Sequence, residues 1–250
     1  MPSPSTVLIT GCSSGFGLDT ARLFLDQGWR VLATMRTPRE DLLPASERLR
    51  VLALDVNDSR SIARCLEQAG PIDALVNNAG VGLAAPLEGL AQASIREVFD
   101  TNVLGTIAMT QAVLGPMRER SRGVIVNVTS SVTLRPLPLL SVYTGSKAAV
   151  NAFTESLALE LEPFGVRLRL VLPGRSPGTR FGENARRLMA DEPPTAYAEF
   201  QRRVFESMRD SSGPLTESAD VARAVWRAVT DPLAPMRIAA GADALALAAA

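Results

Sequence analysis

The chain has 250 residues, 46% of them hydrophobic, and its 26 basic and 26 acidic side chains give a formal net charge of zero. This composition is typical of a globular protein with a sizeable core, and the lack of charge runs indicates neither nucleic acid nor an anionic membrane as a partner. The absence of histidine excludes a Ser-His-Asp triad and a His-Glu-x-x-His zinc site, so acid–base chemistry must use Tyr, Lys, Asp or Glu. The two cysteines are far apart in sequence and favour neither a metal site nor a disulfide scaffold.

The first predicted elements are a strand at 6–10 and a helix at 15–27, joined by a glycine-rich turn. The turn consists of Thr10-Gly11-Cys12-Ser13-Ser14-Gly15-Phe16-Gly17. Glycine tolerates positive φ angles and lets a pyrophosphate approach bare N–H groups at a helix N-terminus, where the helix dipole favours anions. The spacing G-x-x-x-G-x-G differs from the standard dinucleotide fingerprint G-x-G-x-x-G. Taken alone, the turn fits a dinucleotide site or a tight strand-to-helix turn without a ligand.

Strands and helices alternate along the next part of the chain. Asp58 is the predicted N-cap of one helix, whose apolar residues recur on a single face. Further strands are predicted at 30–35, 50–54, 74–76, 124–128, 167–172 and 236–239, and further helices at 92–120, 143–162 and 218–230. This alternation predicts an α/β protein with a single-domain Rossmann fold, in which helices cover both faces of a doubly wound parallel sheet of about seven strands. No linker divides residues 1–250 into domains.

The alternation lapses between 173 and 215, where we predict no strand. This segment is rich in glycine and proline and contains one helical piece at about 195–208. An excursion of this length from a compact domain is usually a lid or a substrate-binding loop. An ordinary helix packed at the sheet edge, or a subunit contact, explains the same pattern.

Tyr143 and Lys147 are spaced i and i+4 on a predicted helix, so they share one face. A nearby ammonium favours the phenolate form of tyrosine and would lower its pKa from about 10. Tyr143 would then be a usable proton donor or acceptor without histidine. The pattern Y-x-x-x-K alone also arises by chance on helix surfaces.

Several motifs together resemble those of the short-chain dehydrogenase/reductase family over essentially the whole chain. They occur in the family's order and at close to its spacing. They are the turn at 10–17, Asp55 after the third strand, Asn77-Asn78-Ala79-Gly80, Asn102, a serine upstream of Tyr143, the Y-x-x-x-K pair, and Pro173-Gly174 after the sixth strand. The first and last segments of the chain are similar to the branch that includes steroid and retinol dehydrogenases.

The resemblance implies four catalytic residues. Tyr143 would protonate the carbonyl oxygen in reduction, and Lys147 would hold the nicotinamide ribose and lower the tyrosine pKa. Asn102 would hold a water that relays protons to Lys147. A serine would polarise the substrate oxygen, and the family's spacing of thirteen residues before the tyrosine selects Ser130, with Ser131 as the alternative.

The resemblance also implies the residues that contact the cofactor. Asp55 would meet the adenine edge, and Asn78, Ala79 and Gly80 would lie along the cofactor. The full set is Gly11, Ser13, Ser14, Gly15, Phe16, Gly17, Arg36, Asp55, Val56, Asn78, Ala79, Gly80, Tyr143, Lys147, Pro173, Gly174 and Thr179.

The end of the second strand indicates NADP(H) rather than NAD(H). NAD-dependent members of the family place a carboxylate there, which binds the ribose 2′-hydroxyl. Here the strand ends in Ala33-Thr34-Met35-Arg36-Thr37 and has no carboxylate. The guanidinium of Arg36 is suited to a 2′-phosphate, and Ser13 could add a hydroxyl. Arg36 could equally be a solvated charge at a strand end.

One motif departs from the family pattern. After the sixth strand the family has P-G-x-x-x-T, whose threonine contacts the nicotinamide carboxamide. Here the threonine comes one place late, as Thr179, with Pro177-Gly178 before it. Either Thr179 serves through a bulged loop, or Ser176 replaces it.

An apolar segment that leads into Tyr143, together with apolar and aromatic residues downstream, suggests a hydrophobic substrate pocket, although some of these residues must be core. They are found in the segment 134–140 and at Phe181, Leu188, Tyr197, Phe200 and Phe205. With the branch similarity, this favours a bulky apolar ketone or alcohol as the small-molecule substrate. The resemblance leaves a non-catalytic NADP(H)-binding sensor or scaffold as the alternative, and a dehydratase or epimerase on the same scaffold as a third.

The long helices at 92–120 and 143–162 resemble those through which the family forms dimers and tetramers, so we expect a homodimer or homotetramer. Residues 1–5 lack the basic region and long apolar stretch of a signal peptide. The alanine-rich segment 244–250 is too short to span a bilayer. We therefore expect a cytoplasmic protein with no membrane partner.

Overall fold

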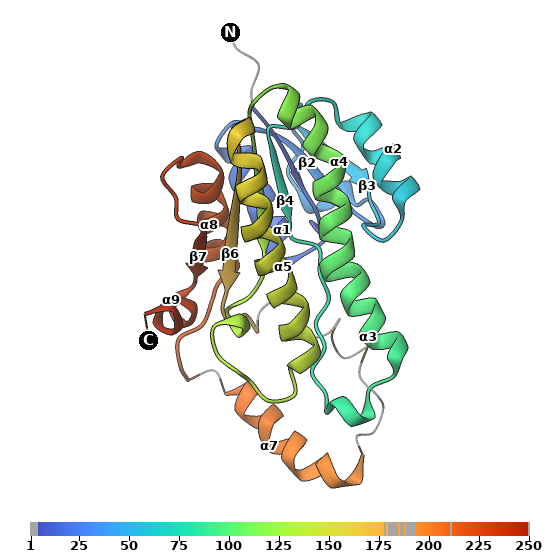
Figure 1. The fold of residues 1–250 in the computed structure, drawn as a ribbon, viewed down its shortest axis with the longest axis vertical. Coiled ribbons are helices and arrows are strands. Elements are labelled where there is room, and N and C mark those ends of the chain that lie inside the picture. The colour runs from blue at the N-terminus through green and yellow to red at the C-terminus, as the bar shows by residue number, and fades with distance from the viewer. Residues whose placement is uncertain are drawn as a thin grey trace.

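The computed structural model of the chain describes residues 5–177, 179, 185, 188, 194–210 and 212–249. Its centre is a seven-stranded sheet in the order β3-β2-β1-β4-β5-β6-β7, in which all neighbouring strands run parallel (Figure 1). The predicted doubly wound fold is therefore confirmed. The strands are β1 (Thr6–Ile9), β2 (Arg30–Met35), β3 (Leu49–Ala53), β4 (Ala74–Asn77), β5 (Gly123–Val128), β6 (Val166–Pro173) and β7 (Arg237–Ala240).

Helices cover both faces of the sheet. One face is packed against α1 and α8, and the other against α2, α4 and α5. The helices are α1 (Gly15–Asp26), α2 (Ser59–Ala69), α3 (Gln92–Phe99), α4 (Gly105–Glu119), α5 (Ser141–Leu161), α7 (Ala198–Arg209), α8 (Ser218–Thr230) and α9 (Ala242–Ala248). Asp58 caps α2 as predicted, since its carboxylate accepts a hydrogen bond from the N–H of Arg60 at 2.9 Å.

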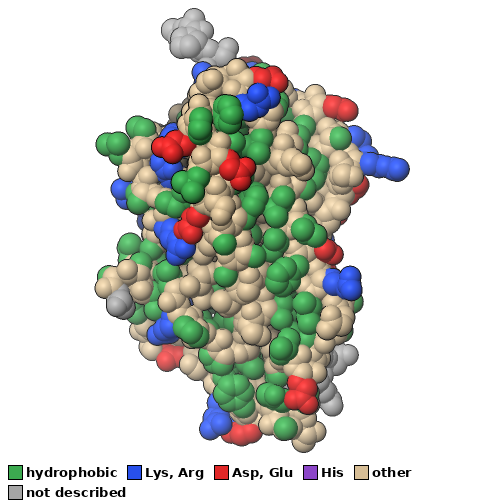
Figure 2. All heavy atoms as spheres, viewed as in Figure 1, with side chains coloured by type: hydrophobic (Ala, Val, Ile, Leu, Met, Phe, Trp, Pro, Cys, Tyr) green, Lys and Arg blue, Asp and Glu red, His purple; other side chains and the backbone are tan. Residues whose placement is uncertain are grey.

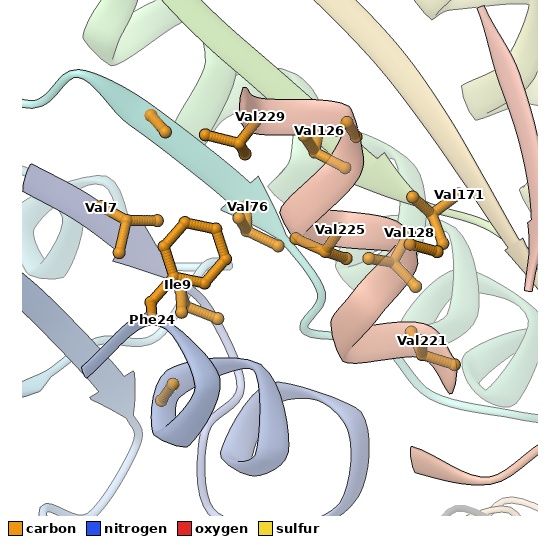
Figure 3. Packing of buried hydrophobic residues seen from close by; sticks show 14 of the residues in the cluster. Val7, Ile9, Phe24, Val76, Val126, Val128, Val171, Val221, Val225 and Val229 are labelled. Atoms are coloured by element: carbon orange, nitrogen blue, oxygen red, sulfur yellow. The ribbon is translucent and has the colours of Figure 1, made fainter. Parts of the chain in front are cut away.

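The alternation of side chains along each strand builds these two layers. In β1, Val7 and Ile9 point into the core beneath α1 and α8, while Leu8 points into the core beneath the other helices. The valines of β5 likewise point into the core beneath α1 and α8. Figure 3 shows Phe24 of α1 and the valines of α8 packed over the side chains of β1, β4 and β5. Strands buried on both faces have few polar positions, which is why they were predictable from sequence.

Two helical features differ from the prediction. The predicted helix at 92–120 is α3 and α4 joined by a π-helical turn at Asp100–Leu104. A π turn inserts an extra residue into the helix, and the polar contacts that favour it come from distant residues. The structure also has a short C-terminal helix, α9, where the sequence analysis predicted no element after the last strand.

The segment proposed as a lid contributes a short 3₁₀ turn (Thr195–Tyr197) and α7, and no strand among its described residues. In Figure 1, α7 lies at the lower end of the molecule, beyond the edge where β6 ends. Phe181, which was assigned to the pocket, lies outside the described residues. In the part of the chain that the structure describes, no helix is both long and apolar enough to cross a membrane.

Candidate active site

A cavity opens at the carboxyl ends of the strands, where the strand order reverses between β1 and β4. Parallel α/β sheets bind ligands at this position. The cavity is formed by the ends of the first five strands, the glycine turn and α5. Its lining residues are Thr10, Gly11, Ser13, Ser14, Gly15, Phe16, Thr34, Met35, Arg36, Leu54, Asp55, Val56, Asn57, Asn78, Ala79, Gly80, Val81, Glu97, Thr101, Val128, Thr129, Tyr143, Lys147 and Thr179.

The glycine turn is closed by contacts that no side chain could enter. A Cβ on Gly17 would meet the carbonyl oxygen of Gly11 and would lie 2.5 Å from Asn78 Nδ2. Gly11 itself has a φ of +75° and approaches Ala79 so closely that a Cβ would lie 2.9 Å from its Cα. Gly17 is buried in the turn and does not line the cavity, so its role is to allow the close approach.

Thr10 and Asn78 join this turn to the segment after β4. The side chain of Asn78 donates from Nδ2 to the carbonyl oxygens of Thr10 and Gly11 at 3.0 and 3.1 Å. In return, Thr10 Oγ1 accepts hydrogen bonds from the N–H groups of Asn78 and Ala79, both at 2.9 Å. The two walls of the cavity are therefore fixed relative to each other. Thr10 was in the motif but was not assigned as a site residue.

The end of β2 presents a cation and no carboxylate to the cavity. Its lining residues there are Thr34, Met35 and Arg36, and the guanidinium of Arg36 is exposed to solvent. The carboxylates among the lining residues are those of Asp55 and Glu97, which come from other elements.

Tyr143 lies at the N-terminal end of α5 and is buried, with 7% of its surface exposed. Burial raises the pKa of its phenol to about 12, and a hydrogen bond with the Ser130 side chain lowers that pKa in part. This contact selects Ser130 over Ser131 as the serine that meets the tyrosine. Ser130 lies two residues after the end of β5, so the sheet positions Ser130 and α5 positions Tyr143.

Lys147 lies one turn further along α5, with its Nζ 5.9 Å from the centre of the Tyr143 ring. Nζ donates to the carbonyl oxygen of Val128 at 3.1 Å, and burial lowers the pKa of the ammonium to about 8. The predicted lowering of the tyrosine pKa is not found in this structure, because burial raises the pKa of the phenol and the hydrogen bond with Ser130 lowers it only in part. Lys147 is also the only lysine in the chain.

Asn102 lies in the π turn and is 1% exposed. Its Oδ1 accepts from the N–H of Val81 at 2.8 Å, while Nδ2 donates to the Val81 carbonyl at 2.9 Å and to Ser146 Oγ at 3.0 Å. The side chain thus connects the segment after β4 to α5, directly beside Lys147. Asn102 and Ser130 do not line the cavity; they contact residues that do.

The residues of the turn after β6 differ in their position relative to the cavity. Pro173 and Gly174 were assigned to the cofactor, but they do not line the cavity, and Gly174 is packed against Asp243 instead. Thr179 does line it, and its Cγ2 lies 3.3 Å from where a Cβ on Gly15 would be. Thr179 Oγ1 donates to the Ser176 carbonyl at 3.0 Å, which favours Thr179 over Ser176 as the residue that faces the cavity.

The remaining lining residues were missed because they lie beside the motifs at strand ends or on α3 and the π turn, where only the spatial arrangement identifies them. Thr129 is the most informative of them. It is 4% exposed, and its Oγ1 has no hydrogen-bond partner among the described residues. A buried hydroxyl that opens onto a cavity is available to a ligand or a water. The others are Thr34, Met35, Leu54, Asn57, Val81, Glu97, Thr101 and Val128.

The residues assigned to a hydrophobic pocket divide into different groups. Leu188 is 5% exposed and belongs to a core cluster with Leu83, Val98 and Val142. Phe200 is 41% exposed on α7.

Nowhere in the described part of the chain do three or more Cys, Asp or Glu side chains gather as a metal site requires.

A family model described as short chain dehydrogenase matches residues 5–188. The chain belongs to the short-chain dehydrogenase family. Bovine (Bos taurus) retinol dehydrogenase 8 is 45% identical over 184 residues, which cover 69% of this chain and 59% of that protein. Human 17-beta-hydroxysteroid dehydrogenase type 1 is 42% identical over 181 residues, covering 67% of this chain and 55% of the relative.

The chain thus spans less than two thirds of the length of these two relatives of the family. A solved structure of the closed form of serine dehydrogenase complexed with NADP⁺ covers more of the chain. It aligns with 95% of both chains at a TM-score of 0.81 and 30% identity.

Proposed function

We propose that the protein is an NADP(H)-dependent oxidoreductase that interconverts a secondary alcohol and a ketone. The observation that carries the proposal is the buried Tyr143 phenol, which bonds to Ser130 and lies beside Lys147 in the same cavity as the glycine turn. A bound dihydronicotinamide would supply the hydride. The protein supplies placement and the proton.

The cavity fits such a nucleotide in its donors and its shape. Gly11 and Gly15 line the cavity without side chains, and Gly15 begins α1, so the N-terminus of this helix borders the cavity. The unpartnered hydroxyl of Thr129 provides a further polar group near Lys147.

Tyr143 acts as the acid in the reducing direction. With a pKa of about 12 it holds its proton at neutral pH and donates it from the phenol to the substrate oxygen. The Ser130 hydroxyl polarises the same oxygen. Lys147, with a pKa of about 8, is mainly an ammonium at pH 7, so its charge stabilises the phenolate that the proton leaves behind. Asn102 holds the water that returns protons to Lys147.

Arg36 selects NADP(H) by pairing with the 2′-phosphate. The support is the exposed guanidinium at the end of β2, where no carboxylate lines the cavity, together with the NADP⁺ of the serine dehydrogenase neighbour. Charge-assisted hydrogen bonds contribute about 1.5–3 kcal/mol, so Arg36→Ala should raise the NADPH Kd by a factor of roughly 10 to 100. Binding of NADH should change little. Equal kcat/KM values for NADH and NADPH in the unaltered protein would contradict the preference.

The substrate is a bulky apolar ketone or alcohol. The support is the loop at 134–140, which is apolar apart from Arg135 and leads directly into Tyr143. The names of the retinol and 17-beta-hydroxysteroid dehydrogenase relatives point in the same direction. We infer that α7 and its neighbouring segment form the lid over this substrate and that the enzyme acts in the cytoplasm.

The function is tested by fluorescence titration with NADPH and NADH, followed by turnover of a panel of bulky ketones, measured as loss of the reduced-nicotinamide absorbance. Tyr143→Phe should lower kcat by a factor of about 10² to 10⁴ and leave the NADPH Kd within about twofold. Ser130→Ala should also lower kcat/KM, whereas its neighbour Ser131→Ala should not. Nucleotide binding with no turnover across the panel would instead favour a sensor or scaffold.

A further inference from the structure

The turn that follows β6 is held by residues near the C-terminal end of the chain. Gly174 donates its N–H to Thr216 Oγ1 at 3.0 Å, and Arg175 donates its N–H to Asp243 Oδ2 at 2.6 Å. Thr216 Oγ1 in turn donates to Asp243 Oδ1 at 2.6 Å, a length typical of a charge-assisted bond. Thr216 is 3% exposed, so its hydroxyl is shielded from water, whereas Asp243 is half-buried. The hydroxyl and the carboxylate therefore hold the first two amides of the turn, although the N–H of Gly174 also donates to the Ala240 carbonyl at 3.2 Å.

Two glycines leave the space that this pair occupies. A Cβ on Gly174 would run into the carboxylate of Asp243, and a Cβ on Gly241 would run into Oγ1 of Thr216. Gly241 also has a φ of +97°, which favours glycine. The backbone on both sides is thus shaped around the Thr216–Asp243 pair.

Arg175 connects the pair to the site. Besides its N–H bond to Asp243, its carbonyl accepts from the N–H of Thr216 at 2.9 Å, and its guanidinium donates to the Met208 carbonyl of α7 at 3.1 Å. Thr179, which lines the cavity beside Gly15, lies only four residues further along the chain. The position of Arg175 therefore limits where both Thr179 and the end of α7 can lie.

We propose that Thr216 and Asp243 are positioning residues for cofactor binding, which act by ordering Gly174 and Arg175 at the start of the turn that leads to Thr179 before the nucleotide arrives. The inference rests on the proposed function. A turn that is already ordered spares the binding step the entropy of ordering it. Neither residue touches the cavity, and both lie outside the part of the chain that the family model matches.

The test compares variants of Thr216 and Asp243 in the full chain by fluorescence titration with NADPH. Thr216→Val keeps the shape but removes Oγ1, and it should raise the NADPH Kd about tenfold, which corresponds to 1.4 kcal/mol. Thr216→Ser restores the hydroxyl and should bring the Kd back to within about twofold. Asp243→Ala should raise the NADPH Kd as much as Thr216→Val does. Asp243→Asn can still accept from Arg175, so its NADPH Kd should fall between those of the unaltered protein and Asp243→Ala. At saturating NADPH, kcat should change much less than the KM for NADPH.

Asp73→Ala is the matched control for a general loss of stability. Asp73 Oδ2 accepts a backbone N–H from Thr6 at 2.9 Å, as Asp243 does from Arg175, but it lies at the opposite, amino edge of the sheet. This variant should lower the melting temperature and leave the NADPH Kd unchanged. An equal rise in Kd for Asp73→Ala would overturn the positioning role, and so would an unchanged Kd in Thr216→Val and Asp243→Ala.

Hydrogen exchange of a peptide covering 174–179 in the free protein tests the ordering step without any nucleotide. Exchange should be faster in Thr216→Val than in the unaltered protein and slow again in Thr216→Ser. Unchanged exchange would contradict the ordering of the turn. If the unaltered protein binds neither nucleotide, the proposed function and a role in cofactor binding both fail, and this exchange result still decides whether the pair orders the turn.

Discussion

The ammonium of Lys147 is buried beneath the site, where its charge opposes folding. Its pKa is about 8 in the folded protein and 10.5 when exposed, so between these values the unfolded chain binds more protons than the folded one. Stability therefore rises with pH across this window. The full penalty applies below pH 8, and it disappears above about pH 10.5. The buried charge of Lys147 therefore does not contribute to stability at neutral pH.

Replacing Lys147 by methionine should stabilise the protein at pH 7. Removing the buried charge gains roughly 3 kcal/mol, and leaving the Val128 carbonyl without its donor costs about 1 kcal/mol, so the net gain is about 2 kcal/mol. Denaturant unfolding at several pH values measures this, and the gain should fall as the pH rises until, towards pH 11, only the cost of about 1 kcal/mol for the lost hydrogen bond remains. The same variant should lose turnover. If Lys147→Met is less stable than the unaltered protein at pH 7, the buried ammonium stabilises the folded state, which would contradict this prediction.

Because Lys147 is the only lysine, amine-specific labelling reports on the site directly. Such reagents attack the neutral amine, so labelling of Lys147 should rise with a midpoint near pH 8, and NADPH should slow it at least tenfold. Peptide mapping separates Lys147 from the α-amino group, whose pKa is also near 8. Lys147→Arg provides the unlabelled control. Labelling that NADPH does not slow would place the nucleotide elsewhere.

At the scale of elements, the glycine turn depends on close contact more than on flexibility. In Gly17→Ala the new methyl group would collide with the Gly11 carbonyl and with Asn78 Nδ2, which breaks the bonds between the turn and the segment after β4. The NADPH Kd should rise at least tenfold, as fluorescence titration would show. Gly115→Ala is the control, because nothing lies within 4 Å of that position in α4. It should keep nucleotide binding and gain about 0.5–1 kcal/mol of stability. Unchanged binding in Gly17→Ala would show that the turn can relax.

The elements that the sequence predicted well are those whose signal is local. Strands such as β5 are nearly continuous apolar runs, and the glycine turn is recognisable from its residue types. The π turn at Asn102 was not predictable, because it is accompanied by hydrogen bonds to Val81 and Ser146, which are distant in sequence. For the same reason the raised pKa of Tyr143 was missed, since it depends on burial by the whole fold.

The contacts of the C-terminal segment were missed on the same grounds. The sequence placed Gly174 at the cofactor because the motif lies there in the family. In the structure Gly174 faces Asp243, a residue 69 positions later whose role no local pattern indicates. Motif spacing thus located the site, whereas the residues that support it come from distant parts of the chain.

At the scale of the whole molecule, the face that carries α4 and α5 is rich in exposed apolar side chains. Figure 2 shows hydrophobic side chains along the face on which α4 and α5 lie in Figure 1. Leu159 of α5 is 73% exposed, and Leu104, which ends the π turn before α4, is 57% exposed. Exposed leucines on neighbouring helices are typical of a subunit interface. We therefore expect this face to join copies of the chain into a dimer or tetramer.

Light scattering at micromolar concentration tests this assembly. The unaltered protein should have the mass of a dimer or tetramer, and Leu159→Asp should shift it towards the monomer, because an interface would have to bury the new carboxylate without a partner. Leu233→Asp is the control: Leu233 is 88% exposed but lies in the connection between α8 and β7 and not on α5. This variant should keep the mass of the unaltered protein. A monomer before any substitution would contradict the assembly, and dissociation by Leu233→Asp alone would place the interface at the connection between α8 and β7.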